Sequence, residues 1–335
     1  MEEYIITIDT GTTNTRAILW DKNRTRIGVQ KAEVGVRDTA IDGNNKKLQN
    51  AVKMCIEKLL AEGGLTYKNI KRIIASGMIT SNVGLVEVPH LTAPAGLDDF
   101  AAATKPIELP EICELPIWFI PGVKNFSEAV TLQNYESMDI MRGEEVESIS
   151  IIQKYNVKGS LIVVLPGSHT KIVMVNSDKK IAGCLTTITG ELLASITNDT
   201  IIADAVGRKF AEEDNYDWDM VQLGYKNASK VGVSRACFSA RILNQFLLKD
   251  KSKVANYILG VALQNDIVSR QNASTMQSDK NTTVVVAGKN PFRKALTDIL
   301  KSENIFENVI ENVEPGDVPL SALGAYIVAE KCNIL

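Results

Sequence analysis

Apolar residues along the chain recur in short runs separated by polar or glycine-containing turns. Alternating β-branched and aliphatic runs predict strands, and longer segments with helically spaced apolar positions predict helices. In the first half, the predicted elements are strands at 4–9, 15–20, 26–34 and 72–75 and a helix at about 46–62. In the second half, they are strands at 160–165, 170–175, 181–188 and 283–287 and helices at about 191–206, 234–248 and 254–277.

Both halves follow one order: strand, glycine turn, strand, polar turn, strand, helices, and a strand that ends in glycine. This self-similarity predicts a duplication into two mixed α/β lobes. The alternative is chance recurrence, since any α/β protein repeats strands and glycines. We expect an N-terminal lobe at 1–155, a C-terminal lobe at 156–319, and a final segment, 320–335, whose helix at 320–331 packs on the first lobe. The Ala-, Pro- and Glu-rich stretch 101–116 is predicted to be an inserted loop.

The turn after the first strand reads D-T-G-T-T at residues 9–13. Glycine lets a backbone approach a phosphate closely, and successive N–H groups and hydroxyls can donate to its oxygens. Asp9 would hold Mg²⁺ through water, and Arg16 would donate to the transferring phosphoryl group. The alternative is a hairpin turn whose side chains satisfy only local backbone groups. We assign the phosphate contacts to three residues of the turn: Gly11, Thr12 and Thr13.

The same place in the second half is occupied by P-G-S-H-T-K at residues 166–171. Two such hairpins would hold the polyphosphate of ATP from both sides. His169 would donate a hydrogen bond to phosphate, although a plain loop or packing role is the alternative. The sequences GxxxxGKS/T and GxGxxG do not occur, so those nucleotide-binding motifs are not predicted. The predicted contacts in this second loop are Gly167, Ser168, His169 and Lys171.

Composition narrows the expected partners. The formal net charge of −3 disfavours nucleic acid and anionic membrane surfaces. The five cysteines are scattered and form no CxxC pair, which is typical of a reducing compartment. The amino-terminal sequence lacks the features of a signal peptide, and no apolar run is long enough to span a membrane. We expect a cytoplasmic protein with a small-molecule substrate.

Several motifs carry a family resemblance. The first loop and the duplicated lobe resemble the actin/hexokinase/heat-shock-chaperone ATPase superfamily. The likeness narrows to the 2-dehydro-3-deoxygalactonokinase family, because five blocks match in order over most of the chain. The blocks are I-D-T-G-T-T-N-T-R at 8–16, S-G-M-I-T-S-N-V-G at 76–84 followed by P-H-L at 89–91, I-P-G at 120–122 with M-R-G-E-E at 141–145, L-P-G-S-H-T-K at 165–171, and T-G-E-L at 189–192.

The resemblance implies an architecture and a reaction. It implies two ribonuclease H-like lobes with mixed five-stranded sheets and an ATP cleft between the lobes. It also implies that the chain uses ATP and Mg²⁺ to phosphorylate 2-dehydro-3-deoxy-D-galactonate at its 6-hydroxyl. The alternatives are a kinase for another sugar or 2-keto sugar acid, a non-catalytic ATP-binding regulator, and a phosphatase of the same fold. The oligomeric state is left open, with a homodimer as one option.

The resemblance also assigns site residues. Glu144 is the predicted base for the hydroxyl proton, with Glu145 and Asp139 as alternatives. Arg142 would pair with the carboxylate of the sugar acid, and Glu191 would contact a water on Mg²⁺. Each also has a purely structural alternative, such as a salt bridge or a helix-terminal charge. The remaining predicted contacts are Ser76, Met78, Ser81 and Asn82 for the sugar acid, and Gly190 and Gly288 for the nucleotide.

Overall fold

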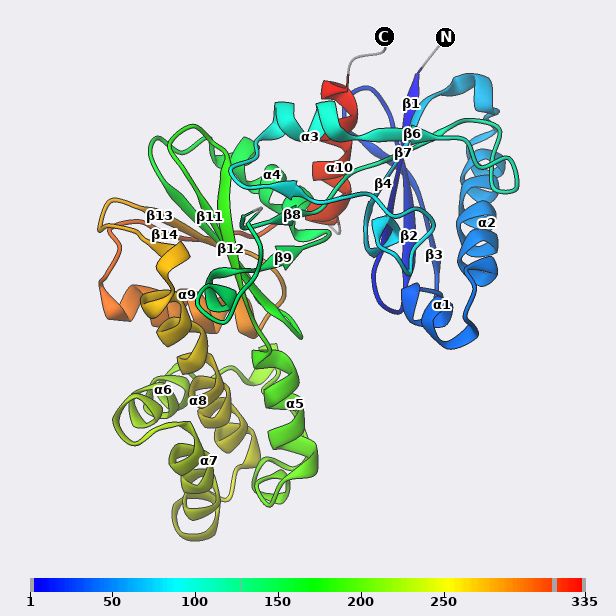
Figure 1. Ribbon diagram of the computed structural model, residues 1–335. Helices are drawn as coiled ribbons and strands as arrows, with labels where there is room; N and C mark the ends of the chain where they lie inside the picture. The colour runs from blue at the N-terminus through cyan, green and yellow to red at the C-terminus, as the bar shows by residue number, and fades with distance from the viewer. Residues whose placement is uncertain (1–2, 127, 315–317, 333–335) are drawn as a thin grey trace. The chain divides into compact units, whose positions relative to one another are not determined.

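The computed structural model describes residues 3–126, 128–314 and 318–332. The chain folds into two compact units (Figure 1). Unit 1 combines 1–156, 179–182 and 314–335, and unit 2 combines 157–178 and 183–313. Within the described ranges, no helix has both the length and the apolar character needed to cross a membrane.

Unit 1 is built on a six-stranded mixed sheet with the order β3-β2-β1-β4-β7-β6. Strands β1, β2 and β3 form antiparallel hairpins, whereas β4 is parallel to both β1 and β7. A separate sheet has the order β5-β8-β9. The strands are β1 (Tyr4–Thr10), β2 (Thr15–Trp20), β3 (Arg26–Ala32), β4 (Ile70–Gly77), β5 (Leu91–Thr92), β6 (Lys105–Ile107), β7 (Ile117–Phe119), β8 (Val123–Lys124) and β9 (Ile140–Met141).

Helices cover the main sheet of unit 1 on both faces. Alternate side chains of β1, including Ile6 and Ile8, share a buried cluster with α2. On the other face Trp20 lies against Tyr326 of α10, with ring centroids 5.7 Å apart. Figure 1 shows α2 and α10 on opposite sides of these strands. The helices of unit 1 are α1 (Val36–Asp42), α2 (Lys46–Gly63), α3 (Leu97–Ala103), α4 (Glu144–Tyr155) and α10 (Leu320–Lys331).

Unit 2 has a five-stranded mixed sheet with the order β12-β11-β10-β13-β14. Strands β10 and β11 form an antiparallel hairpin, and β13 runs parallel to β10. Its strands are β10 (Leu161–Leu165), β11 (Thr170–Val175), β12 (Ile181–Thr187), β13 (Thr283–Val286) and β14 (Val309–Glu311), and its helices are α5 (Thr189–Asp199), α6 (Trp218–Val231), α7 (Val233–Ile242), α8 (Lys251–Asn272) and α9 (Phe292–Glu303).

The structure confirms the predicted class of mixed α/β sheets, and it changes several elements. The sheet of unit 1 has a sixth strand, β6, within the stretch expected to be a loop. The helix expected at 191–206 ends at Asp199 and is followed by a short 3₁₀ turn at Ala203–Val206. Helix α8 ends at Asn272 rather than 277. Helix α6 was not predicted.

Candidate active site

The first phosphate loop joins β1 to β2 in unit 1. The N–H of Gly11 donates to the carbonyl of Asn14 at 2.9 Å, which closes a tight turn. The carbonyls of Gly11 and Thr12 accept hydrogen bonds from the first two residues of α1, at 3.2 and 2.9 Å. Gly11, Thr12 and Thr13 are exposed. The loop is therefore fixed on one side while its small residues stay open to a ligand.

Asp9 lies at the end of β1, directly opposite Arg16 in the hairpin register. Its Oδ2 accepts a hydrogen bond of 2.8 Å from the hydroxyl of Ser321 in α10. Burial raises the pKa of Asp9, although Ser321 and the positive charge of Arg16 both act to lower it. A Cβ placed on Gly77 would lie 2.9 Å from Asp9 Oδ1, so the end of β4 passes close beside this carboxylate.

The start of α4 reaches the same edge of the sheet. Gly143 has a φ of +113°, and a Cβ built on it would lie 3.4 Å from Cα of Gly77. Glu144 follows as the first residue of α4 and is partly exposed. Glu145 instead folds back, and its Oε2 accepts the N–H of Gly143 at 2.7 Å. Glu145 is buried, and burial followed by repulsion from Glu144 raises its pKa well above the ordinary value.

Glu147 completes a carboxylate cluster with Asp9 and Glu144. Burial, and then repulsion from Glu144 and Asp9, raises the pKa of Glu147 to about 8, and only Arg16 opposes this shift. We call Asp9, Glu144 and Glu147, together with Arg16, the carboxylate cluster. Because these carboxylates repel one another and Arg16 offsets only part of that repulsion, binding of a further cation beside them would be favourable.

Arg142 precedes this helix and points toward the segment after β4. Its Nη1 donates to the hydroxyl of Thr80 at 2.6 Å, and its Nη2 donates to the carbonyl of Val88 at 2.7 Å. Arg142 forms no ion pair with a carboxylate in the ranges that the structure describes. A guanidinium has five N–H donors, so Arg142 keeps donors for an anionic ligand.

His90 contacts the same guanidinium. Its Nδ1 lies 3.4 Å from Nη2 of Arg142. Burial and the positive charges of Arg142 and Lys124 lower the pKa of His90 to about 4, so the ring is neutral at pH 7. Because Arg142 can only donate, Nδ1 is the acceptor and Nε2 carries the hydrogen. That Nε2 is buried without a hydrogen-bond partner among the described residues.

The other predicted sugar-acid contacts follow β4 with mixed exposure. Ser76 is fully buried at the end of β4, and its hydroxyl has no hydrogen-bond partner in the described part of the chain. The hydroxyl of Ser81 donates to the carbonyl of Met78 at 2.7 Å and closes a short turn. Met78 is partly exposed and Asn82 is exposed. Asn82 and Met78 are therefore the more accessible members of this set.

In unit 2, the second phosphate loop and the start of α5 are packed into one body. A Cβ on Gly190 would overlap the carbonyl of Gly167, so only glycine permits this contact. The N–H of Glu191 donates to the carbonyl of Ser168 at 3.1 Å. The Glu191 carboxylate lies 2.9 Å from Nε2 of His169, and both side chains are more than half exposed.

Two further predicted residues of unit 2 flank this body. Lys171 is buried, and its ammonium donates to the hydroxyl of Thr186. Gly288 follows β13 with a φ of +95°, and a Cβ on it would lie 3.2 Å from the carbonyl of Pro166. The Gly288 turn therefore lies beside the second phosphate loop.

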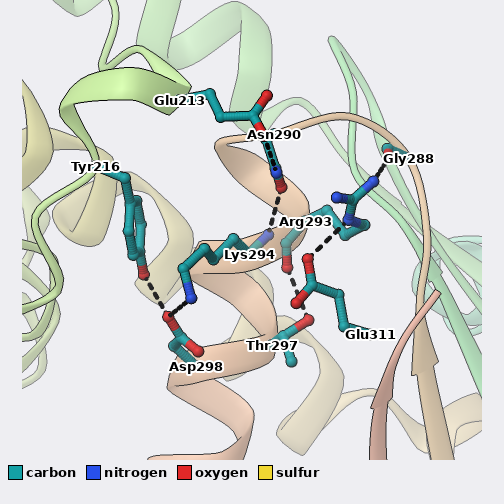
Figure 2. A network of polar contacts seen from close by, with 9 residues as sticks. All are labelled: Glu213, Tyr216, Gly288, Asn290, Arg293, Lys294, Thr297, Asp298 and Glu311. Carbon is teal, nitrogen blue, oxygen red and sulfur yellow. Dashed lines mark hydrogen bonds and ion pairs between the residues drawn. The ribbon is translucent and has the colours of Figure 1, made fainter. Parts of the chain in front are cut away.

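Figure 2 shows how α9 holds the Gly288 turn. Nη1 of Arg293 donates to the carbonyl of Gly288 at 3.0 Å, while its Nε donates to Glu311 at 2.9 Å. Asn290 donates to the carboxylate of Glu213 at 2.7 Å. These contacts fix the backbone of the turn from both sides, and Gly288 itself stays exposed.

Comparison with known proteins identifies the family of the chain. The model of the 2-keto-3-deoxy-galactonokinase family matches residues 9–314. The chain belongs to the 2-keto-3-deoxy-galactonokinase family. It is accordingly a carbohydrate kinase whose substrate is a small sugar acid.

Solved structures agree with this kinase in fold. A Sinorhizobium meliloti protein proposed to be a 2-dehydro-3-deoxygalactonokinase has a TM-score of 0.72 at 20% identity, covering 98% of this chain and 97% of its own. An activator of 2-hydroxyisocaproyl-CoA dehydratase from Clostridium difficile with bound ADPNP (TM-score 0.47, 12% identity, 98% and 95% covered) and a glucokinase from Balamuthia mandrillaris with glucose (0.44, 13%, 98% and 94%) are too distant to support any inference. No protein with a curated description matches the chain.

The kinase contains one group in its candidate site that sequence reasoning did not select. Glu147 lies three residues after Glu144, and this spacing places both on one face of α4. The three-residue spacing of Glu144 and Glu147 in a predicted helix could have indicated that both carboxylates belong to the site. The alternative base Asp139 accepts the N–H of Ile140 through Oδ1 at 2.7 Å.

The carboxylate cluster can be tested for its fit to Mg²⁺. In the described part of the kinase, no three His, Cys, Asp or Glu side chains are grouped as a metal-binding set. Mg²⁺ in phosphoryl-transfer sites usually takes only one or two protein carboxylates and completes its shell with water and phosphate. Burial raises the pKa of Asp9, and burial with carboxylate repulsion raises the pKa of Glu147. Both shifts are consistent with such a cation, because its positive charge would stabilise the two ionised carboxylates.

Proposed function

We propose that the chain transfers the γ-phosphoryl group of ATP to the 6-hydroxyl of 2-dehydro-3-deoxy-D-galactonate, giving the 6-phosphate and ADP. One observation carries this proposal: Arg142, a partly buried cation with no ion pair among the described residues, lies just before α4, which supplies two members of the carboxylate cluster. A cation suited to the carboxylate of a sugar acid thus lies close to a carboxylate suited to its hydroxyl. The family match supports the same substrate.

In this proposal Glu144 accepts the proton of the attacking hydroxyl. It is favoured over Glu145 because Glu145 is buried and its carboxylate caps the backbone of its own helix. A carboxylate in the first turn of a helix is stabilised as an anion by the helix dipole. Arg16 donates to the transferring phosphoryl group, and Arg142 binds the carboxylate of the acceptor through its free donors.

The nucleotide contacts are proposed for both loops. On unit 1 they are the exposed residues Gly11, Thr12 and Thr13. On unit 2 they are Gly167, Ser168, His169, Gly190 and Gly288, which lie together because the start of α5 and the Gly288 turn both pack against the second phosphate loop. Lys171 would act through Thr186, because its ammonium is bound to that hydroxyl.

Asp9 and Glu147 are proposed to hold Mg²⁺, and Glu191 to contact a water on it. A bound Mg²⁺ would neutralise charge on the phosphate oxygens. Two further contacts would orient these groups. The hydroxyl of Ser321 orients Asp9 through its 2.8 Å hydrogen bond, and Glu191 orients the ring of His169.

An acceptor screen tests the proposal. The chain is incubated with Mg-ATP and a set of acceptors, and ADP release is measured. The set contains 2-dehydro-3-deoxy-D-galactonate, its gluconate epimer, D-galactonate and glucose. The named acid is expected to give kcat/KM about 10-fold or more above D-galactonate and glucose, because Arg142 binds a carboxylate and the site is proposed to bind a 2-keto, 3-deoxy carbon chain. A preference over the epimer, which shares both features, is expected from the family match.

Other results of the screen assign other functions. A higher kcat/KM for the epimer or another sugar acid would replace the substrate. ATP binding without turnover on any acceptor would indicate a regulator. Phosphate release without an acceptor would indicate a phosphatase.

A further inference from the structure

Asp266 is a buried carboxylate on α8 of unit 2, and it accepts hydrogen bonds from two threonine hydroxyls. Asp266 is 1% exposed. Its Oδ1 accepts from the hydroxyls of Thr187 and Thr189, and these two hydroxyls lie 3.0 Å apart. Thr170 also lies close enough to lower the pKa of Asp266, although burial dominates and raises it. Asp266 has no ion-pair partner within the part of the chain that the structure describes.

The three threonines come from the segments that form the nucleotide-side body. Thr170 directly follows His169 and begins β11. Thr187 ends β12, and Thr189 begins α5 and directly precedes Gly190. Asp266 therefore lies next to both segments that meet in the contact between Gly190 and Gly167: the one that ends the second phosphate loop and the one that leads into α5. Among the hydrogen bonds of the described residues, Asp266 is the one side chain outside this pair that accepts from Thr187 and Thr189.

A structural role alone is a poor explanation for this carboxylate. Burying a carboxylate without a cation costs several kcal/mol, and hydroxyl donors recover only part of that cost. The side chains that line the same small cavity are apolar, such as Ile162 and Ile172, apart from Arg270, which forms no ion pair with Asp266 among the described residues. An apolar residue would therefore suit most of the surrounding core. What an apolar residue lacks is a fixed acceptor for Thr187 and Thr189.

We propose that Asp266 is a positioning residue, which fixes the second phosphate loop and the start of α5 through Thr187 and Thr189 in the geometry that binds nucleotide phosphates. The inference rests on the proposed use of ATP. Thr189 is the first residue of α5, Gly190 after it packs on Gly167, and the N–H of Glu191 donates to the carbonyl of Ser168. Without the acceptor, these contacts lose their anchor and the loop samples other conformations.

The test removes the hydroxyls while leaving the shape of each side chain. Thr187→Val and Thr189→Val are compared with Thr187→Ser and Thr189→Ser, which keep the hydroxyl. Thr197→Val is the matched control, because Thr197 is buried in the same helix α5 but its hydroxyl bonds to backbone carbonyls of that helix, at 2.9 and 3.1 Å. Binding of Mg-ATP is measured by calorimetry without any acceptor, and thermal unfolding checks that each variant folds.

The valine variants are expected to raise the Kd and KM for ATP about 10-fold, since a loosened loop must be ordered on binding. The serine variants and Thr197→Val should stay within about twofold of the wild type, and KM for the sugar acid should not change. A positioning role predicts this split, whereas a purely structural role would lower only the unfolding temperature or the fraction of binding-competent protein. Valine variants that fold and bind ATP with the wild-type Kd would overturn the proposal.

Should a valine variant fail to fold, Thr189→Ala replaces it, because alanine removes the hydroxyl without adding a methyl group at its place. The same Kd criterion then decides. A wild-type chain that binds ATP but phosphorylates no sugar acid would refute the proposed function and leave this inference open to the same binding test. A wild-type chain that binds no nucleotide would overturn both.

Discussion

Glu147 lies one turn into α4, where burial and the carboxylates of Glu144 and Asp9 raise its pKa to about 8. An unfolded chain ionises this group near pH 4.5, the ordinary value for glutamate. Between these two values the folded state holds one more proton than the unfolded state. The free energy of unfolding therefore falls as pH rises through this window, and the stabilisation is complete only below it.

This shift predicts a pH-dependent stability that one substitution removes. The unfolding temperature of the ligand-free protein should decline by several degrees between pH 5 and pH 8. Glu147→Gln keeps the shape but cannot ionise, so its decline should be clearly smaller. Glu111→Gln, at an exposed position, should keep the wild-type slope. Equal slopes in all three proteins would show that Glu147 does not hold its proton in the fold.

Glu144 predicts a kinetic effect at the same place. Glu144→Gln should lower kcat by roughly 10² to 10⁴ while the unfolding temperature stays near wild type, because a positioned base is lost without a change in volume. Steady-state kinetics of ADP release measures this, with Asp139→Asn assayed in parallel. Near-wild-type turnover in Glu144→Gln, with the loss in Asp139→Asn instead, would move the role of base to Asp139.

Sequence reasoning located part of this site. Asp9, Arg16 and Glu144 were selected from a loop motif and a family resemblance, and these act over short stretches of chain. Glu147 and Asp266 depend on what surrounds them: one is perturbed by a carboxylate 138 residues away (147 − 9), and the other accepts from hydroxyls 77 and 79 residues away. Contacts between residues so far apart in the chain depend on the tertiary fold, so they could not be predicted from a single sequence.

At the scale of elements, α6 and α8 cross at a pair of glycines. A Cβ on Gly260 of α8 would overlap the carbonyl of Val221, and a Cβ on Gly224 of α6 would overlap the carbonyl of Tyr257. The two backbones are therefore in direct contact, and neither position has room for a methyl group. The crossing holds together the helices that carry Asp266 and its surroundings.

The glycine crossing predicts opposite effects for two glycine-to-alanine changes. Gly260→Ala should destabilise the protein by about 1–3 kcal/mol, because the helices must separate. Gly63→Ala lies in the last turn of α2, where the added methyl group meets only the flexible side chains of Leu65 and Leu19. It should be neutral or stabilise by up to about 1 kcal/mol through helix propensity. Urea unfolding measures both, and a stable Gly260→Ala would show that the crossing is loose.

The elements that were predicted well are those whose pattern is long enough to read. Strands β2 and β11 have six residues each and helix α10 has twelve, and their predicted bounds match. Strand β6 has three residues and contains Pro106, which argues against a strand except at the edge of a sheet, where β6 lies. Helix α6 was missed although its buried residues Val221, Tyr225 and Ala228 recur at helical spacing, and Gly224 in its interior is a residue that disfavours helices.

At the scale of the whole molecule, the last helix of the described chain, α10, returns to unit 1 and completes its core. Helix α10 contacts α4 and β1, and a Cβ on Gly324 would overlap the carbonyl of Val146. The buried guanidinium of Arg72 donates to the carbonyl of Cys332 at 3.0 Å and lies 4.4 Å from the ring centre of Trp118. Ser321 reaches Asp9. Helix α10 thus supports both the core and the carboxylate cluster.

Removal of α10 is therefore expected to abolish kinase activity. A chain shortened to end at Asn312 loses the cover of Trp20 and the hydroxyl donor to Asp9, so ADP release should fall to background and unit 1 should become sensitive to protease. Arg24→Gln is the control, since it removes the exposed ion pair with Glu330 and the contact of the guanidinium with the ring of Tyr326 but leaves α10 in place, and it should cost about 1 kcal/mol or less. Retained activity in the shortened chain would show that α10 is dispensable.

The docking of Ser321 on Asp9 also fixes when a newly made chain can become active. A ribosome delivers β1 and β2 first and α10 only after all of unit 2, so the face of the sheet that carries Trp20 of β2 stays uncovered for most of translation. Unit 2 is contiguous apart from one short turn and can fold while it waits. The hydrogen bond that orients Asp9 in the carboxylate cluster forms only after translation has passed residue 321, so a nascent chain is expected to lack kinase activity until then.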